Sequence, residues 1–309
     1  MTSAPAASPE AERARGYGRW NGERSAQIWR WWVIARGNLA LAWSNRWVKV
    51  LMVASLVPGI IAAGVTYFFL PLSAQVLDSV MHFTIVSCFL VAAVVGARLV
   101  SDDRRQGAFL AHFARPVTRI DYVAGKFVAL LLPLLVVTIA PPLFAVGASL
   151  AVDSDRLTDQ LADQGIDPRS IPDEQGFLTA ADPWGASGAV LAYGLVASAT
   201  TAGIVLGISA LATRARIAGL LWFAIVALGS AAKAILQRSL GAPDWPALLS
   251  WSDALGDISS FLVGFHDQPS IGRALEFTLA ARIALLAALA AAGLLVVHEQ
   301  LRRAEGGAR

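Results

Sequence analysis

The residues able to do covalent chemistry are few in this sequence, and they stand far apart. The single cysteine, Cys88, lies in an apolar run, which excludes an intrachain disulfide and a cysteine metal cluster. HExxH and GxSxG motifs are absent, and Gly125-Lys126 lacks the upstream glycine of a phosphate-binding loop. The histidines are isolated from one another: His82, His112, His266 and His298. We therefore expect no catalytic residue, no metal site and no cofactor in this chain.

The densest group of charges lies between residues 96 and 126, in the segment GARLVSDDRRQGAFLAHFARPVTRIDYVAGK. Long apolar runs flank this segment on both sides. Short basic loops beside membrane spans remain on the cytoplasmic side. The segment is therefore expected just beneath a membrane, where a soluble partner can bind it. Its bases are Arg98, Arg104, Arg105, Arg115, Arg119 and Lys126.

The composition predicts an all-α integral membrane protein. Of the 309 residues, 56% are hydrophobic and only 15% are charged, whereas a soluble domain has about 25% charged residues. An apolar helix of about 20 residues suffices to cross a bilayer. Six such helices are expected within a domain over 48–297, at about 48–70, 81–100, 122–150, 186–212, 217–236 and 277–297.

The basic residues predict the orientation of these spans. Residues 1–49 contain eight Arg and Lys, and further bases occur at 214–216 and 302–309. The loop 151–185 instead contains eight acids and two bases. With six spans, all the basic segments fall on one side. We therefore expect a multi-pass protein of the cell (inner) membrane with both termini in the cytoplasm.

Two further helices are predicted outside the spans. Residues 26–47 contain five tryptophans together with arginines, a composition typical of a helix lying along the cytoplasmic membrane interface. It either anchors the N-terminus or also contacts a partner. Residues 248–262, within an outer loop over 237–276, predict an amphipathic helix that rests on the outer surface or re-enters the membrane. Residues 1–25 and 298–309 are expected to form cytoplasmic tails, the first of them disordered.

The segment 98–121 and the residues after it resemble a known family. Gly96 is followed by Asp102-Asp103-Arg104-Arg105, Gly107-Ala108-Phe109, Arg115-Pro116-Val117-Thr118-Arg119, and then Tyr122, Gly125 and Lys126. This order is similar to that of permease subunits of ABC type-2 exporters. Ala108-Phe109 replaces the usual Thr-Leu, and the run of Asp and Arg replaces a run rich in Glu.

The resemblance implies that a coupling helix over about 102–114 docks into a separate ABC ATPase, which binds ATP and magnesium. It also implies a second permease copy, contact with membrane lipid and no binding of nucleic acid. Asp102 and Asp103 are expected to cap the helix, and Pro116 to end it. From the residues alone, a solvated loop that only sets topology remains an alternative. The coupling residues are predicted to be Asp102, Asp103, Arg104, Arg105, Gly107, Phe109, Phe113, Arg115, Pro116 and Arg119.

A substrate path is the second site that the sequence suggests. Ser198 and Thr201 are hydroxyls within the fourth span, and Lys233 and Arg282 are the deepest charges of the last two spans. Intramembrane charges mark candidate functional positions, although these two are also placed to snorkel or to pair with Glu276 or Asp244. The expected function is the permease of an ATP-driven exporter. The alternatives are a membrane scaffold or assembly factor without transport, and an intramembrane enzyme.

Charge reversal of Arg104 and Arg105, or Phe109→Asp, tests the predicted docking segment. Each change should abolish stimulation of the ATPase by the permease while the spans remain folded, because the altered residues would face the partner. ATPase activity of the reconstituted complex measures this effect. Variants that retain full coupled activity would contradict the docking role.

Overall fold

A computed structural model describes residues 29–68, 74–107, 117–151, 183–240, 249–263 and 272–306. The regular structure of these residues is helical, and six of the helices are long and apolar enough to cross a membrane. This confirms the predicted all-α architecture and the number of spans. The spanning helices are α3 (Arg46–Phe68), α4 (Ala74–Val91) with its continuation, α8 (Arg119–Leu150), α11 (Pro183–Leu211), α12 (Ala215–Leu240) and α14 (Gly272–Gly306).

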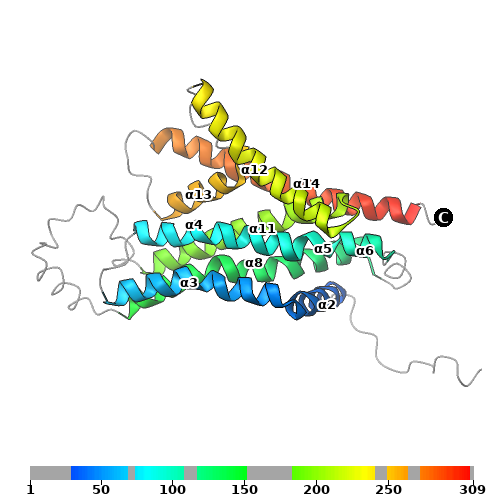
Figure 1. The fold of residues 1–309 in the computed structure, drawn as a ribbon, viewed down its shortest axis with the longest axis horizontal. Helices are drawn as coiled ribbons and strands as arrows, with labels where there is room; N and C mark the ends of the chain where they lie inside the picture. The colour runs from blue at the N-terminus through cyan, green and yellow to red at the C-terminus, as the bar shows by residue number, and fades with distance from the viewer. Residues whose placement is uncertain are drawn as a thin grey trace, which may run out of the picture.

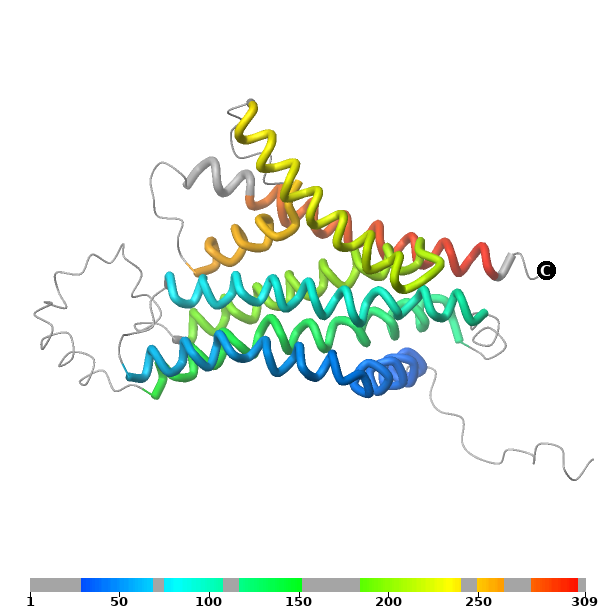
Figure 2. The backbone as a smooth tube through the Cα atoms, viewed as in Figure 1, coloured from blue at the N-terminus to red at the C-terminus, as the bar shows by residue number. Residues whose placement is uncertain are grey.

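Four of these helices, α3, α4, α8 and α11, run side by side as the centre of the bundle (Figure 1). Helix α2 (Arg30–Ser44) lies across one end of α3 and α8. The tube drawing shows α12 and α14 diverging from the centre at the opposite end (Figure 2). The end that carries α2 also carries the start of α8 and the end of α14. Both described ends of the chain therefore lie at the same end of the bundle.

The second span is longer than the sequence predicted. Helix α4 continues through a π-helical turn (η2, Ala92–Gly96), α5 (Ala97–Leu99) and α6 (Ser101–Arg105). The expected end at Val100 is therefore wrong, and the charged residues 102–105 extend the span itself. A single π turn within an α-helix changes the direction of the residues that follow it. Here it lies directly before the charged end.

Helix α6 covers the start of the predicted coupling helix over 102–114, and residues 108–116 lie outside the described residues. Its last residue is Arg105, two residues before Gly107. This glycine has φ 65°, the left-handed conformation that commonly ends a helix because glycine adopts it without steric cost. Phe109, Phe113, Arg115 and Pro116 lie outside the described residues.

Helix α8 begins with a capping box. The Thr118 side chain accepts a hydrogen bond from the Asp121 backbone, while the Asp121 carboxylate accepts one from the Thr118 backbone. Two donors at the helix start are thereby satisfied. The helix then runs unbroken past Pro133, Pro141 and Pro142. Gly59 of α3 lies against the Pro141 carbonyl, so this glycine lets two spans approach closely at a proline.

Helix α13 (Trp251–Leu262) lies within the predicted 248–262 segment. It lies among the spans: Trp251 contacts the Trp222 ring in α12 at 5.1 Å, and Ser259 contacts Asp78 in α4. Trp222 lies well inside α12, whereas Asp78 lies near the start of α4. These contacts fit the re-entrant alternative better than a helix lying flat across the ends of the spans.

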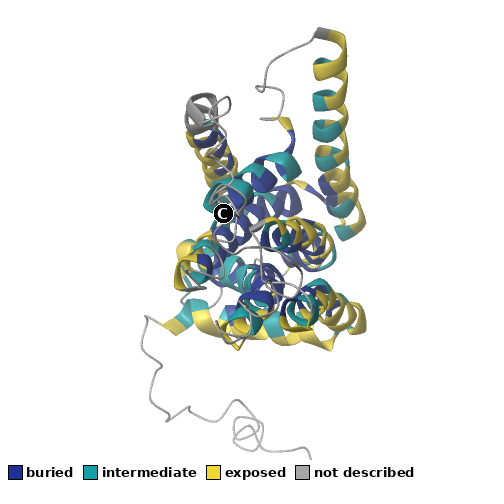
Figure 3. Ribbon diagram, turned by 90° about the vertical axis from the view of Figure 1, so that its left-hand side faces the viewer, coloured by how far each residue is buried: buried dark blue, intermediate teal, exposed yellow. Residues whose placement is uncertain are grey.

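Burial is uneven among the spanning helices. The core consists of aliphatic side chains of α4, α8 and α11 with many small residues. By contrast, only 6% of the apolar window of α12 is buried, against 61% for α11. Figure 3 shows α12 standing apart from the buried centre with its exposed residues in yellow. Helix α12 therefore presents a long apolar face that the described residues do not cover.

Small residues allow α11 and α14 to pack backbone against backbone. A Cβ on Gly293 would lie 2.2 Å from the carbonyl oxygen of Gly203, and one on Gly207 would lie 2.4 Å from the Gly293 Cα. Glycines four residues apart on one helix permit such contacts in membranes. The Gly203-x-x-x-Gly207 spacing thus has a structural role here.

Gly293→Ala should destabilise the fold, because the added methyl group would collide with backbone atoms of α11. Unlike a side chain, these atoms cannot move aside by changing rotamer. Overpacking of this kind costs about 1–3 kcal/mol. Gly147→Ala is the matched control, since a Cβ there meets nothing within 4 Å. Thermal unfolding of both variants in detergent measures the difference. Equal midpoints would show that the α11 and α14 contact tolerates a methyl group.

Candidate coupling site

Three elements meet around one buried ammonium group at the end of the bundle that carries α2. Lys126 and Tyr122 lie one turn apart on α8, Asp103 is on α6, and Asn38 is on α2. The spacing of four residues places Tyr122 and Lys126 on one face of α8. Both side chains reach the Asp103 carboxylate, which links the charged end of the second span to the third span.

The Lys126 ammonium lies 2.7 Å from Asp103 Oδ2 and donates to Asn38 Oδ1 at 2.8 Å. The Tyr122 hydroxyl donates to the same Asp103 oxygen at 2.7 Å. The Lys126 side chain is only 3% exposed. A buried charge is tolerated when it is paired and hydrogen-bonded, so this cluster depends on all four groups remaining together.

Gly125 explains how α2 approaches close enough for Asn38 to take part. A Cβ at this position would lie 2.7 Å from the Trp31 carbonyl oxygen and 2.8 Å from Ile34 Cβ. The Asn38 amide nitrogen donates to the Ile34 carbonyl at 2.7 Å, which leaves its oxygen to accept from Lys126. Gly125 and Lys126 therefore act together, because the glycine lets α2 approach α8 closely and the lysine donates a hydrogen bond to Asn38 of α2.

Helix α6 is also attached to the end of α11. Ser209 Oγ accepts from the backbone nitrogens of Val100 and Ser101, at 3.2 and 3.1 Å. The predicted capping by Asp102 and Asp103 is wrong, since α6 has no side-chain cap of its own. The donors that precede the acids are satisfied instead by a serine from another helix.

Arg104 has a contact within this chain. Its guanidinium donates to the Ala210 carbonyl at 2.9 Å, at the C-terminal end of α11. A cation is favoured there because the last carbonyls of a helix lack intrahelical partners. Charge reversal at Arg104 would therefore disturb the contact between α6 and α11 directly.

The other predicted coupling residues in the described part of the chain surround this cluster. Arg105 and Gly107 are exposed, and Asp102 is half-buried. Arg119 is half-buried at the first position of α8. Among the described residues at this end of the bundle, the exposed Arg105 thus most clearly directs its charge away from the protein.

The predicted path hydroxyls are buried between helices. Ser198 Oγ lies 3.0 Å from Thr138 Oγ1 of α8, and the Cys88 thiol of α4 donates to Thr201 at 3.6 Å. Both Ser198 and Thr201 are 0% exposed. In this structure they join α11 to its neighbours and do not line an opening.

The deep charges pair with α13. Lys233 lies 3.0 Å from Asp253, and Arg282, only 3% exposed, forms an ion pair with Asp257. These two acids of α13 are four residues apart, while the predicted partners Glu276 and Asp244 lie outside the residues whose side chains the structure describes. Burial raises the pKa of Asp257, although the Arg282 charge opposes that shift.

Helix α13 is attached to α4 as well. Asp78 Oδ1 accepts hydrogen bonds from Ser259 at 2.7 Å and from Ser260 at 3.1 Å. Asp253 and Asp257 attach α13 to α12 and α14, and Asp78 attaches it to α4. Among the described residues, no group of three His, Cys, Asp or Glu side chains is placed to bind a metal ion.

The six spans, together with a charged segment fixed at one end, define a multi-pass membrane protein of the transporter type. The sequence profile of the ABC-2 family transporter proteins matches residues 63–236, more than half of the chain. The chain belongs to this family, whose members are membrane components of transporters and are not themselves catalytic. No protein of curated function matches the sequence. The matched region includes Asp103, Tyr122 and Lys126 but not Asn38.

Sequence reasoning missed the roles of Lys126, Tyr122, Asn38 and Ser209. A signal existed for the first two, because a lysine and a tyrosine four residues apart share a helix face. Asn38 and Ser209 are far from Asp103 in the sequence. Neither belongs to a local pattern that would connect it with the charged segment.

Asp103→Leu should be strongly destabilising, because Lys126, only 3% exposed, would lose its counter-charge. Breaking a buried pair from one side costs about 3–5 kcal/mol. The double change Lys126→Met with Asp103→Leu should recover part of that loss. Thermal unfolding in detergent measures the stability of the single variant, of the double variant and of a control. The control is Glu299→Gln, which alters an exposed ion pair. A single variant as stable as the control would contradict the importance of the pair.

Proposed function

We propose that this chain is the permease subunit of an ABC exporter, coupling ATP hydrolysis by a separate subunit to movement of a substrate across the membrane. The observation that carries the proposal is the buried Lys126 and Asp103 ion pair. This ion pair joins the charged end of the second span to the third span, at the end of the bundle that carries α2. Membership of the ABC-2 family supports a transport role.

Coupling needs a segment that transmits movement without bending. Helix α6 contacts α8 through Asp103 and α11 through Arg104 and Ser209, and Lys126 of α8 in turn binds Asn38 of α2. A push on the residues that follow Arg105 would therefore move these helices as a unit. We propose that the ATPase, with its ATP and magnesium, docks on this end and that both termini lie in the cytoplasm.

The uncovered face of α12 supports a second permease copy as a further partner. Its exposed apolar residues include Leu220, Phe223 and Leu228. Symmetric pairing of two copies would bury such a face. We further propose that α13 forms the outer gate, since the ion pairs of Asp253 and Asp257 attach it to α12 and α14.

Arg105→Glu separates docking from folding more cleanly than the double reversal of Arg104 and Arg105. Arg105 is exposed, so its reversal should leave the unfolding temperature unchanged while reducing stimulation of the ATPase. Arg104→Glu is the matched comparison, and it should lower both quantities because it breaks the contact with α11.

The measurement is ATPase activity of the complex in vesicles, with stability recorded on the same samples. Undiminished stimulation in Arg105→Glu and in Phe109→Asp would contradict docking at this segment. A complex that binds the ATPase without any stimulation or substrate movement would favour the scaffold alternative instead.

A further inference from the structure

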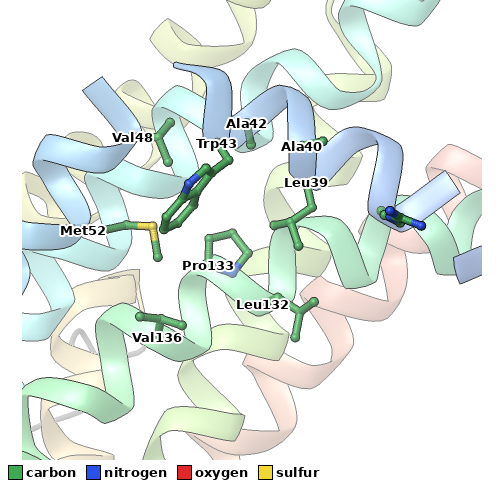
Figure 4. A pocket seen from close by; sticks show the side chains of 10 residues that line it. Leu39, Ala40, Ala42, Trp43, Val48, Met52, Leu132, Pro133 and Val136 are labelled. Carbon is green, nitrogen blue, oxygen red and sulfur yellow. The ribbon is translucent and has the colours of Figure 1, made fainter. Parts of the chain in front are cut away.

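An apolar groove of about 390 Å³ lies between α2, α3 and α8. This volume falls within the range of about 300–1,000 Å³ that is usual for small-molecule sites. Figure 4 shows Trp43 and Met52 on one side of the groove and Pro133 with Leu132 on another. The lining residues are Arg36, Leu39, Ala40, Ala42, Trp43, Val48, Met52, Leu132, Pro133 and Val136.

The groove has one charged lining residue, Arg36 of α2. Arg36 is exposed, while the rest of the lining is apolar apart from the indole nitrogen of Trp43. Two of its walls, α3 and α8, are helices long and apolar enough to cross a membrane. The groove thus combines a hydrocarbon-like interior with a single cation on its border.

The charged residues of α2 and α3, which form two walls of the groove, have one sign. Residues 29–68 contain four bases and no acid: Arg30, Arg36, Arg46 and Lys49 are the bases. Tryptophan and arginine together favour the headgroup layer of a bilayer, and basic segments are attracted to anionic lipids. A guanidinium also presents paired donors that match a phosphate group.

We propose that this groove binds one acyl chain of an anionic phospholipid from the surrounding bilayer, with the lipid phosphate held by Arg36. The hydrocarbon chain would lie against Leu39, Met52 and Pro133. A second copy of the chain fits this surface less well, because symmetric contact through α2 would bring together arginines of the described segment 29–68, which contains no acid. This lipid site uses no residue of the predicted docking segment, so it does not rest on the proposed transport function.

Native mass spectrometry of the full-length protein tests the site. The protein is measured in mixed micelles that contain phosphatidylglycerol and phosphatidylcholine with identical acyl chains. The wild-type chain should retain phosphatidylglycerol preferentially. Arg36→Gln should reduce that preference about fivefold, the equivalent of one basic residue at an anionic surface. Arg216→Gln, an exposed arginine outside the groove, is the matched control and should change nothing.

A second variant tests the groove rather than the charge. Ala40→Trp should fill part of the groove and reduce retention of both lipids, with the unfolding temperature recorded as a check on folding. Equal retention of the two lipids by the wild-type chain would overturn the proposal. Equal effects of Arg36→Gln and Arg216→Gln would overturn it too.

Photo-cross-linking identifies the occupant directly. A benzophenone side chain placed at the exposed position Val136 should give an adduct with phosphatidylglycerol in vesicles. An adduct with a second copy of the chain, or with residues 1–28 of the same chain, would show that protein fills the groove and would overturn the proposal.

Discussion

The ion pair between Lys126 and Asp103 is the contact on which the arrangement at one end of this protein depends. A lysine that is only 3% exposed needs a counter-charge and further hydrogen bonds, and it finds them on two other helices. Because an unpaired charge there is costly, the cluster allows little freedom to α6 relative to α8. The requirement to satisfy one buried charge thereby fixes the direction in which the second span ends.

Several local features serve that contact. Gly125 lets α2 approach so that Asn38 reaches the lysine, and the capping box at Thr118 sets where α8 begins. Ser209 and Arg104 attach the same short helix to α11. The opposite end of the bundle is built differently. There α13 is held to α12 and α14 by ion pairs and to α4 by hydrogen bonds of Asp78.

Much of the fold was predictable from the sequence because long apolar runs and the distribution of arginine reflect the bilayer directly. All six spans occur where hydropathy predicts them. Helix α6 was harder to delimit, because Asp102 and Arg104 suggest a loop although the backbone remains helical to Arg105. Gly107, with its positive φ, follows the end of α6, and the rest of the predicted helix over 102–114 lies outside the described residues.

The candidate site was only partly predictable for a related reason. Asp103 and Arg104 stood out as charges in a basic segment, but their partners within the chain come from distant positions such as Asn38 and Ala210. Sequence spacing carries no information about such pairs. The same holds for Arg282, whose partner Asp257 becomes apparent only when α13 is placed among the spans.

The central claim is that α6 and the start of α8 move as one body, and a distance measurement tests it most directly. Spin labels at Gln106 and Ile120, both exposed, would be introduced in a Cys88→Ser background and the complex measured with and without ATP. A narrow distance distribution that ATP leaves unchanged, and that broadens when Lys126 is replaced by methionine, is the predicted result. A distance that shifts with ATP in the otherwise unaltered chain would contradict the account.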